Sequence, residues 1–244
     1  YLSCYCWVAW LYLLLRKKNS LILMRFSVII CTYNREKYLY NVLQSIAEQD
    51  FSMKDYEILL INNNSTDNTE IVCRNFNSDF PTVDFRYFLE ENQGLSYARN
   101  RGIEESQGEI LVFVDDDATV FDNYLVAIDQ FFENTPNAIA CGGPIIPVYE
   151  TGKPQWLSHF TEQLIGGALN GGDKIKPFKN GKYPGGGNSA FRKEVFKKYG
   201  IFNVDLGRKG TNLIGAEEKD LYDRLKRGGE MFYYVPQMGI YHYI

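Results

Sequence analysis

Two hydrophobic patterns alternate along the first half of this chain. Uninterrupted apolar runs of strand length, rich in β-branched and aromatic residues, are separated by segments in which apolar residues recur every three or four positions. The runs predict strands at residues 26–31, 56–61, 83–88 and 109–114, and the periodic segments predict helices at residues 36–49, at 68–76 and after residue 92. This alternation, with short connections, predicts βαβ units and a mostly parallel sheet.

The second half of the chain is less regular. Helices are predicted at residues 122–132, 193–199 and 216–227, and apolar or strand-like runs lie at residues 145–149, 231–235 and 238–243. Residues 150–187 are rich in Gly, Pro, Lys and aromatic residues, and we predict no element there. Loops of this length inside a compact domain tend to be functional lids or binding surfaces.

Residues 1–24 stand apart from these patterns. Residues 1–15 are apolar and aromatic, and a basic cluster follows them at residues 16–18. The run is shorter than the roughly 20 residues that a membrane-spanning helix needs. It fits a truncated membrane anchor, an interfacial segment, or sequence upstream of a start at Met24, and we favour the last. The chain also stops shortly after His242, which leaves a missing C-terminal part open.

Composition narrows the function classes. The chain has 244 residues, of which 45% are hydrophobic and 23% charged, and a formal net charge of −4. A nucleic-acid binder usually carries a basic surface, so that class is disfavoured. A nucleotide-sugar substrate is compatible with this charge, because a bound metal can neutralise its phosphates. The five cysteines are odd in number and scattered, which predicts reduced thiols and a cytoplasmic protein, with peripheral contact at the inner face of the membrane left open.

The fourth predicted strand ends in three carboxylates, Asp115, Asp116 and Asp117. In open α/β sheets, ligands bind just beyond the carboxyl ends of the strands. Carboxylates at that place suit a hard divalent cation, which prefers oxygen ligands and can bridge to substrate phosphates. The alternative is a solvated acidic turn that caps the next helix, but such a turn does not require three acids after a buried strand. The pattern therefore favours a metal–diphosphate site.

Polar residues also follow the first two predicted strands, at Thr32-Tyr33-Asn34 and at Asn62-Asn63. In a parallel sheet these strand ends lie at one edge, so the groups can converge with the acids on a single ligand, a nucleoside with a metal-bridged diphosphate. Neither Gly-x-x-x-x-Gly-Lys nor Gly-x-Gly-x-x-Gly follows the first strand. This argues against a kinase, a P-loop nucleotidase or a dinucleotide dehydrogenase.

Six segments form a recognisable combination in this order. They are residues 26–35 (FSVIICTYNR), 62–67 (NNNSTD), 92–103 (NQGLSYARNRGI), 113–117 (FVDDD), 185–192 (GGGNSAFR) and 215–225 (GAEEKDLYDRL). The combination covers residues 26–242 and resembles the family 2 glycosyltransferases. The resemblance implies a GT-A fold, with a Rossmann-like, mostly parallel sheet flanked by helices. It also implies inverting transfer of a sugar from a nucleotide diphosphate, usually UDP, to a glycan or lipid-linked acceptor in bacterial surface polysaccharide biosynthesis.

The resemblance also assigns roles to single residues. The nucleotide would be lined by Thr32, Tyr33, Asn34, Asn62, Arg99, Asp115 and Asp116. The metal, Mn²⁺ or Mg²⁺, would be held by Asp117 together with Asp115 and His242. The donor sugar or the acceptor would be bordered by Gly186, Gly187, Asn188, Glu217 and Trp156. Glu218 would be the catalytic base that accepts the proton of the acceptor hydroxyl. Residues 25–120 would form the nucleotide-binding half of one domain, and residues 121–244 its donor-sugar and acceptor half.

The chain departs from the family pattern at two positions. Asn62 stands where relatives commonly have an Asp that accepts a hydrogen bond from uracil, and an amide can accept or donate. Glu218 replaces a frequent Asp and keeps the carboxylate on a longer arm. Structural roles also stay open: Glu217 and Glu218 could simply favour a helix start, and Trp156 could stack on a sugar or anchor a loop. The alternative functions are a nucleotidyltransferase and a catalytically silent nucleotide- or sugar-binding module.

Overall fold

The computed structural model describes residues 24–158, 161–162, 167–179, 181–209 and 215–244. The interpretation of residues 1–24 therefore falls outside the described part, except for Met24. The first half contains β1 (Phe26–Thr32), α2 (Glu36–Ala47), β2 (Tyr56–Asn62), α3 (Thr69–Asp79), β3 (Asp84–Leu89), α4 (Leu95–Glu105) and β4 (Ile110–Asp115). The second half contains β5 (Ala118–Val120), α5 (Tyr124–Asn134), β6 (Ala140–Gly142), β7 (Ile145–Val148), β8 (Lys176–Pro177), β9 (Asn188–Arg192), α7 (Glu194–Tyr199), α8 (Glu217–Arg227), β10 (Phe232–Tyr234) and β11 (Ile240–Tyr243).

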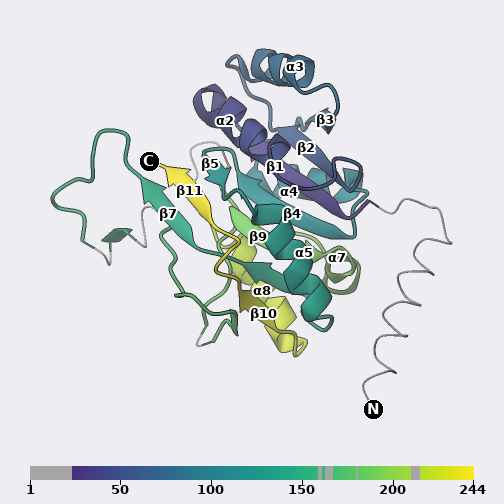
Figure 1. The fold of residues 1–244 in the computed structure, drawn as a ribbon, viewed down its shortest axis with the longest axis vertical. Helices are drawn as coiled ribbons and strands as arrows, with labels where there is room; N and C mark the ends of the chain where they lie inside the picture. The colour runs from purple at the N-terminus through teal and green to yellow at the C-terminus, as the bar shows by residue number, and fades with distance from the viewer. Residues whose placement is uncertain (1–23, 159–160, 163–166, 180, 210–214) are drawn as a thin grey trace.

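A twisted eight-stranded sheet with the order β3-β2-β1-β4-β9-β6-β10-β8 runs through the molecule (Figure 1). Strands β1, β2, β3 and β4 pair in parallel, as do β6 and β10. Strand β9 is antiparallel to both β4 and β6, and β8 is antiparallel to β10. The expectation of an α/β fold with a mostly parallel sheet is confirmed.

Helices cover both faces of this sheet because each central strand is apolar on both sides. On one face, residues such as Val28 and Ile30 pack with the buried sides of α2, α3 and α5. On the other face, Ile29 and Phe113 pack with α4, α7 and α8. β4 is buried along its apolar length and becomes partly exposed only at Asp115, where the carboxylates begin. The core thus holds the acidic end of β4 at the carboxyl edge of the sheet.

A second, three-stranded sheet with the order β5-β11-β7 lies beside this edge. Strand β11 pairs in parallel with β7 and antiparallel with β5, where His242 is opposite Ala118. Because Ala118 directly follows the three acids, this pairing brings the end of the chain back to them. The described part of the chain contains no helix long and apolar enough to span a membrane.

Three smaller features complete the fold. In the turn after β2, Asp67 Oδ1 accepts a hydrogen bond from the Thr69 N–H at 3.1 Å. Its Oδ2 accepts another from the Glu36 N–H at 3.0 Å, so one carboxylate serves the starts of α2 and α3. The three described cysteines, Cys31, Cys73 and Cys141, are free thiols. Strands β5 and β9 were not expected, because both are short and each follows residues typical of turns.

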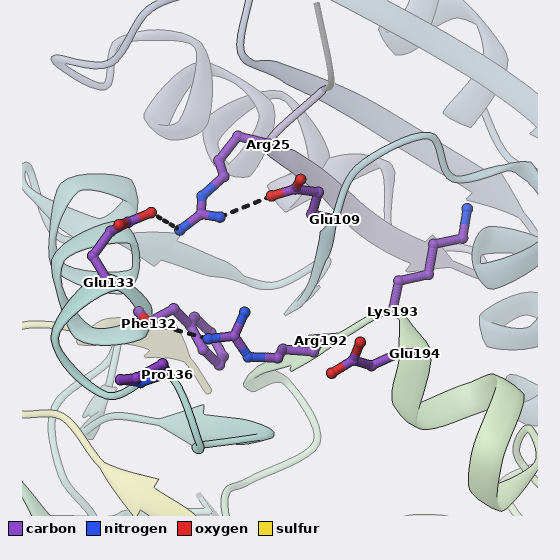
Figure 2. Close-up of a pocket in the computed structure, with 8 residues that line it drawn as sticks. All are labelled: Arg25, Glu109, Phe132, Glu133, Pro136, Arg192, Lys193 and Glu194. Atoms are coloured by element: carbon purple, nitrogen blue, oxygen red, sulfur yellow. Dashed lines mark hydrogen bonds and ion pairs between the residues drawn. The ribbon is translucent and has the colours of Figure 1, made fainter. Parts of the chain in front are cut away.

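An ion-pair cluster closes the opposite, amino edge of the sheet (Figure 2). Arg25, with only 8% of its side chain exposed, binds Asp129 at 2.6 Å and Glu109 and Glu133 at 2.9 Å each. A cavity of about 600 Å³ lies against this cluster, next to Arg192 and Lys193. The cations there already have partners: Arg192 donates to two backbone carbonyls, and Lys193 donates to the Ser106 carbonyl. The cluster therefore joins α5 to the segment before the first strand.

We expect Arg25→Met to lower the free energy of unfolding by about 1–3 kcal/mol, because it leaves three neighbouring carboxylates without their shared cation. The partly exposed partners keep this below the cost of a fully buried pair. Arg74→Met is the matched control, since its pair with Glu70 is exposed on both sides and is worth only about 0.3–0.5 kcal/mol. Urea unfolding of both variants measures the difference, and equal losses would contradict the assignment.

Candidate active site

A cavity of about 350 Å³ opens at the carboxyl edge of the parallel strands. Its walls come from the ends of β1 and β4, from the loop before α4 and from β11. The lining residues are Cys31, Thr32, Tyr33, Arg35, Asn63, Gln93, Leu95, Ala98, Asp115, Asp116, Asp117, Arg208 and His242. Six of them, Thr32, Tyr33, His242 and the three acids, are residues that the sequence analysis assigned to the nucleotide or the metal.

Asp115, Asp117 and His242 each offer one ligand atom, and these atoms all lie within 4.8 Å of one another. His242 Nε2 is 3.1 Å from Asp117 Oδ1, and Arg35 Nη1 is 2.7 Å from Asp117 Oδ2. Burial opposes ionisation, but the hydrogen bond from His242 and the charges of His242 and Arg35 lower the pKa of Asp117. Asp117 is therefore an anion over the whole neutral range, as a metal ligand must be.

The other two acids are held less favourably as anions. Burial raises the pKa of Asp115, an effect that nearby Arg99 reduces. Burial, with the charges of Asp117 and Asp115, raises the pKa of Asp116 to about 7. Carboxylates that repel one another in this way favour a bound cation. Two carboxylates from the end of β4 and an imidazole from β11 are a donor set that Mn²⁺ or Mg²⁺ accepts.

Behind the acids lies a buried cluster of Arg99, Glu217 and Glu218. Arg99, on α4, has 4% of its side chain exposed; its Nη1 is 2.8 Å from Glu217 Oε1 and its Nη2 is 3.0 Å from Glu218 Oε1. Burial opposes the charge of Arg99, but the charges of Glu218, Glu217 and Asp115 raise its pKa above the ordinary value. Ala216, directly before the two glutamates, has a φ of 89°, a strained conformation for a residue with a Cβ.

The glycines before β9 bring the two groups of acids together. A Cβ on Gly186 would overlap Glu218 Oε1, and a Cβ on Gly187 would overlap Asp115 Oδ2. The backbone therefore passes against both carboxylates, and only glycine fits at these two positions. Consecutive Cα atoms are about 3.8 Å apart, so Glu218 and Asp115 flank a single step of the chain.

We expect Gly186→Ala to lower transferase activity by about 10²-fold, because the new methyl group must displace the Glu218 carboxylate by an ångström or more. Gly229→Asn is the control, since Gly229 has a φ of 78°, which Asn tolerates, and open space around its Cα. Steady-state rates of the two variants, with circular dichroism to confirm folding, test the expectation. Activity of Gly186→Ala within twofold of the parent would contradict this placement of Glu218.

Several residues assigned from the sequence lie outside the cavity wall. The amide of Asn62 donates to Tyr87 Oη and accepts from the Ser65 N–H, each at 2.8 Å. Asn34 holds the Thr66 N–H at 2.7 Å. Asn188 is fully buried and spends its amide on Tyr124, Pro144 and Met238. Trp156 is 70% exposed. These four assignments stay predictions. The amides of Asn62 and Asn188 already form hydrogen bonds through both their oxygen and their nitrogen atoms.

The structure adds Arg35, Gln93 and Arg208 to the cavity, which the sequence analysis did not assign. It also places Asn63, which was expected to converge on the ligand with Asn62, in the cavity wall. Asn63 accepts a hydrogen bond from the Gly94 N–H at 2.7 Å and donates to the Asn92 carbonyl at 2.8 Å, so it ties the loop before α4 to the end of β2. Arg35 and Gln93 belong to segments that carried the resemblance and could have been assigned from it. Arg208 has no such signal, because it lies in a loop far along the chain.

With this geometry established, comparison with known proteins decides the family. The family model described as "Glycosyl transferase family 2" matches residues 27–200, which is more than two thirds of the chain. The chain belongs to glycosyltransferase family 2. The match includes β2 to β9, the three acids and the glycine segment described above, and it ends before Glu217, Glu218 and His242.

Two similar relatives act on lipid-linked substrates by name. The glucosyl-dolichyl phosphate glucuronosyltransferase of Haloferax volcanii is 28% identical over 225 residues, which is 90% of this chain and 69% of that protein. The GalNAc(5)-diNAcBac-PP-undecaprenol beta-1,3-glucosyltransferase of Campylobacter jejuni is 29% identical over 203 residues, 81% of this chain and 62% of that protein. This family 2 chain thus spans about two thirds of the length of each.

Solved structures show the same fold. Staphylococcus aureus TarS, residues 1–349, matches with a TM-score of 0.65 and 21% identity, over 90% of this chain and 60% of that one. The mannosyltransferase PcManGT from Pyrobaculum calidifontis, solved with GDP-Man and Mn²⁺, also matches with a TM-score of 0.65 and 21% identity, over 89% of this chain and 56% of that one. The expectation of a GT-A architecture for this family 2 glycosyltransferase is confirmed.

Proposed function

We propose that this chain is a metal-dependent, inverting transferase that moves a sugar from a UDP donor to a glycan or lipid-linked acceptor. The main support for this proposal is one structural observation. Gly186 and Gly187 pack against Glu218 and Asp115, so a carboxylate suited to act as a base lies beside the acids suited to hold a metal ion that binds the diphosphate. A module that only binds a nucleotide would not need a basic carboxylate such as Glu218 beside the metal-binding acids.

In this proposal the donor lies in the 350 Å³ cavity with its nucleoside between the ends of β1 and β2, near Thr32, Tyr33 and Asn63. Asp115, Asp117 and His242 would hold Mn²⁺ or Mg²⁺, which when bound stabilises the negative charge of the leaving diphosphate. Arg208 lines the same cavity and can add a positive charge next to the phosphates. The protein itself positions the donor sugar toward the glycine segment.

Glu218 carries out the proton transfer. Its carboxylate accepts the proton of the acceptor hydroxyl while that oxygen attacks the anomeric carbon from the face opposite the diphosphate. The new glycosidic bond forms as the carbon–oxygen bond to the diphosphate breaks, and the electron pair leaves with the nucleoside diphosphate. Attack from the opposite face inverts the anomeric configuration. Arg99 holds Glu218 in place through the contact at 3.0 Å.

The choice of UDP rests on the family resemblance and on a related structure, since TarS has been solved in complex with UDP. PcManGT, which has the same fold, was solved with GDP-Man. Asn62 does not decide between them, because its amide is hydrogen-bonded to Tyr87 and Ser65. The donor must therefore be determined by experiment.

The test is slow donor hydrolysis in the absence of acceptor. UDP-glucose, UDP-N-acetylglucosamine, UDP-glucuronate and GDP-mannose are each incubated with Mn²⁺ or with EDTA, and proton NMR follows the first sugar anomer released. We expect a UDP-sugar to be hydrolysed only with Mn²⁺, and the α-linked donor to give the β anomer first. Release of the α anomer first would contradict inversion. Donor binding without any hydrolysis would favour the silent module.

A further inference from the structure

A second groove, distinct from the donor cavity, lies along the edge strand β8. It has a volume of about 420 Å³ and is lined by Lys176, Lys179 and Lys182 over a floor that includes Leu169, Phe178 and Tyr234. We call it the lysine groove. It shares no lining residue with the cavity that contains the three acids. None of the residues assigned to the donor lines this groove.

The lysine groove is positively charged although the chain as a whole is acidic. Residues 171–183 contain four lysines and a single acid, Asp173, against a net charge of −4 for the chain. Within the described residues, Lys179 and Lys182 form no ion pair. Two acids line an adjoining cavity with Lys179 and Lys182, and both are ion-paired with other lysines: Glu230 binds Lys198 at 2.8 Å and Asp223 binds Lys219 at 2.5 Å. The lysine charges are thus available to an anionic ligand.

The groove lies close to the proposed catalytic base. Tyr183 stacks on Tyr222 of α8 with ring centroids 5.1 Å apart, and α8 begins at Glu217. Four residues along the chain from Lys182, the backbone of Gly186 touches Glu218. Four extended residues span at most about 14 Å, so an anion bound by Lys182 lies within a short saccharide of the Glu218 carboxylate.

The surroundings of the groove are apolar as well as basic. Ile175, next to Lys176 in the chain, and Met231, which lines an adjoining cavity together with Lys179 and Lys182, are 53% and 52% exposed. Phosphate oxygens suit the lysines, and a hydrocarbon chain suits the exposed apolar residues and the aromatic floor. A free sugar phosphate would use only the first of these features.

We propose that the lysine groove binds the phosphate or diphosphate of a lipid-linked acceptor, with the acceptor saccharide directed toward Glu218. The inference rests on the proposed transferase function and names its acceptor class. The lysines hold the anionic group, the partly exposed Leu169 and Phe178 contact the first part of the lipid, and the saccharide extends along residues 183–186. The position of the groove would then select acceptors by the length of the saccharide between the phosphate and the hydroxyl that is glycosylated.

The test uses three probes with the full chain in EDTA, where the metal-dependent donor site is not formed. They are farnesyl diphosphate, inorganic diphosphate and farnesol, each titrated by calorimetry. We expect farnesyl diphosphate to bind at least tenfold more tightly than either of the others, and the double variant Lys179→Gln/Lys182→Gln to weaken it about tenfold or more. The control variant, Lys54→Gln/Lys197→Gln, removes two lysines elsewhere on the chain and should bind farnesyl diphosphate with the same affinity as the parent.

Three results would overturn the inference. Equal binding of inorganic and farnesyl diphosphate would show an anion site without a lipid subsite. If both double variants lost the same affinity for farnesyl diphosphate, the effect would come from the net charge of the protein and not from a site in the groove. Lysine variants that lose binding to phosphatidylglycerol vesicles but not to farnesyl diphosphate would identify a membrane contact instead. A titration of UDP with Mn²⁺ separates this inference from the proposed function, since it should be unchanged in all four lysine substitutions.

Discussion

Glu218→Gln should reduce the rate of sugar transfer by about 10³-fold while leaving the affinity for UDP unchanged. The amide keeps the size of the side chain but cannot accept the proton of the acceptor hydroxyl. Because Glu218 lies beside Gly186 and not in the wall of the donor cavity, the substitution leaves the nucleotide contacts intact. Steady-state rates with saturating donor, together with calorimetry of UDP, measure the two effects separately.

Glu104→Gln provides the control for this variant, since Glu104 is an exposed carboxylate on α4. Its rate should be that of the parent. A Glu218→Gln enzyme that retains more than a tenth of the parental rate would show that another group, or bulk water, accepts the proton. A parallel loss of UDP affinity would instead place Glu218 in the donor site.

The second large effect is expected at Arg99. Arg99→Met leaves Glu217 and Glu218 without their shared cation. The side chain of Glu217 is only 4% exposed, and removing one partner of a buried ion pair costs about 3–5 kcal/mol. Arg99→Lys keeps the charge but loses the planar fork that reaches both glutamates. We expect Arg99→Met to be both unstable and inactive, and Arg99→Lys to fold with a reduced rate of transfer.

The pH dependence of stability tests the same cluster. Burial raises the pKa of Glu217 in the folded protein above its ordinary value, although Arg99 counteracts the effect. A carboxyl group with a raised folded pKa binds more protons in the folded state, so its contribution to stability falls as pH rises. Without Arg99 the pKa should rise further. Arg99→Met should therefore lose stability between pH 5 and pH 8 more steeply than the parent does in thermal unfolding.

A flat pH profile for Arg99→Met, with a stability near that of the parent, would show that water reaches the two glutamates. The double variant Arg99→Met/Glu217→Gln is informative here. It removes the buried charge of Glu217, so it should regain part of the lost stability and lose the added pH dependence. No recovery would mean that the loss comes from packing around Arg99, including its contact with the Phe202 ring.

The strands that carry the acids could be predicted because their pattern is local. Residues 109–114 are apolar without interruption, and the structure places β4 at Ile110–Asp115, buried as far as the first carboxylate. The carboxyl ends of parallel strands share an edge, so Thr32 and Asp115 could be expected at one cavity. This part of the site can therefore be predicted from the order of residues along the chain.

The remainder depends on contacts that short-range patterns do not contain. β9 was missed because five residues after three glycines look like the end of a turn, yet this strand lies between β4 and β6 and places Gly187 against Asp115. Arg99 was assigned to the nucleotide because it belongs to a family motif. Its position on the buried side of α4, facing Glu217 across more than a hundred residues of sequence, is visible only in the fold.

Asn62 and Asn63 show that the sequence does not determine which residue at a strand end faces the cavity. Both follow the apolar run of β2, and the family pattern singles out the first. In the structure Asn62 is hydrogen-bonded to Tyr87 and Ser65, whereas Asn63 contributes to the cavity wall. Neighbouring residues at a strand end point in different directions, and where the strand stops decides which of them faces the ligand.

The central claim, a metal-dependent nucleoside diphosphate site at Asp115, Asp117 and His242, is tested most directly by calorimetric titration of UDP with Mn²⁺ and again with EDTA. GDP and CDP serve as comparisons, and Asp117→Ala serves as the variant, with Asp122→Asn as its control. The account predicts binding of UDP that requires both Mn²⁺ and Asp117 and is tighter than that of GDP or CDP. Folded protein that binds none of the three nucleotides in a metal-dependent way would contradict it.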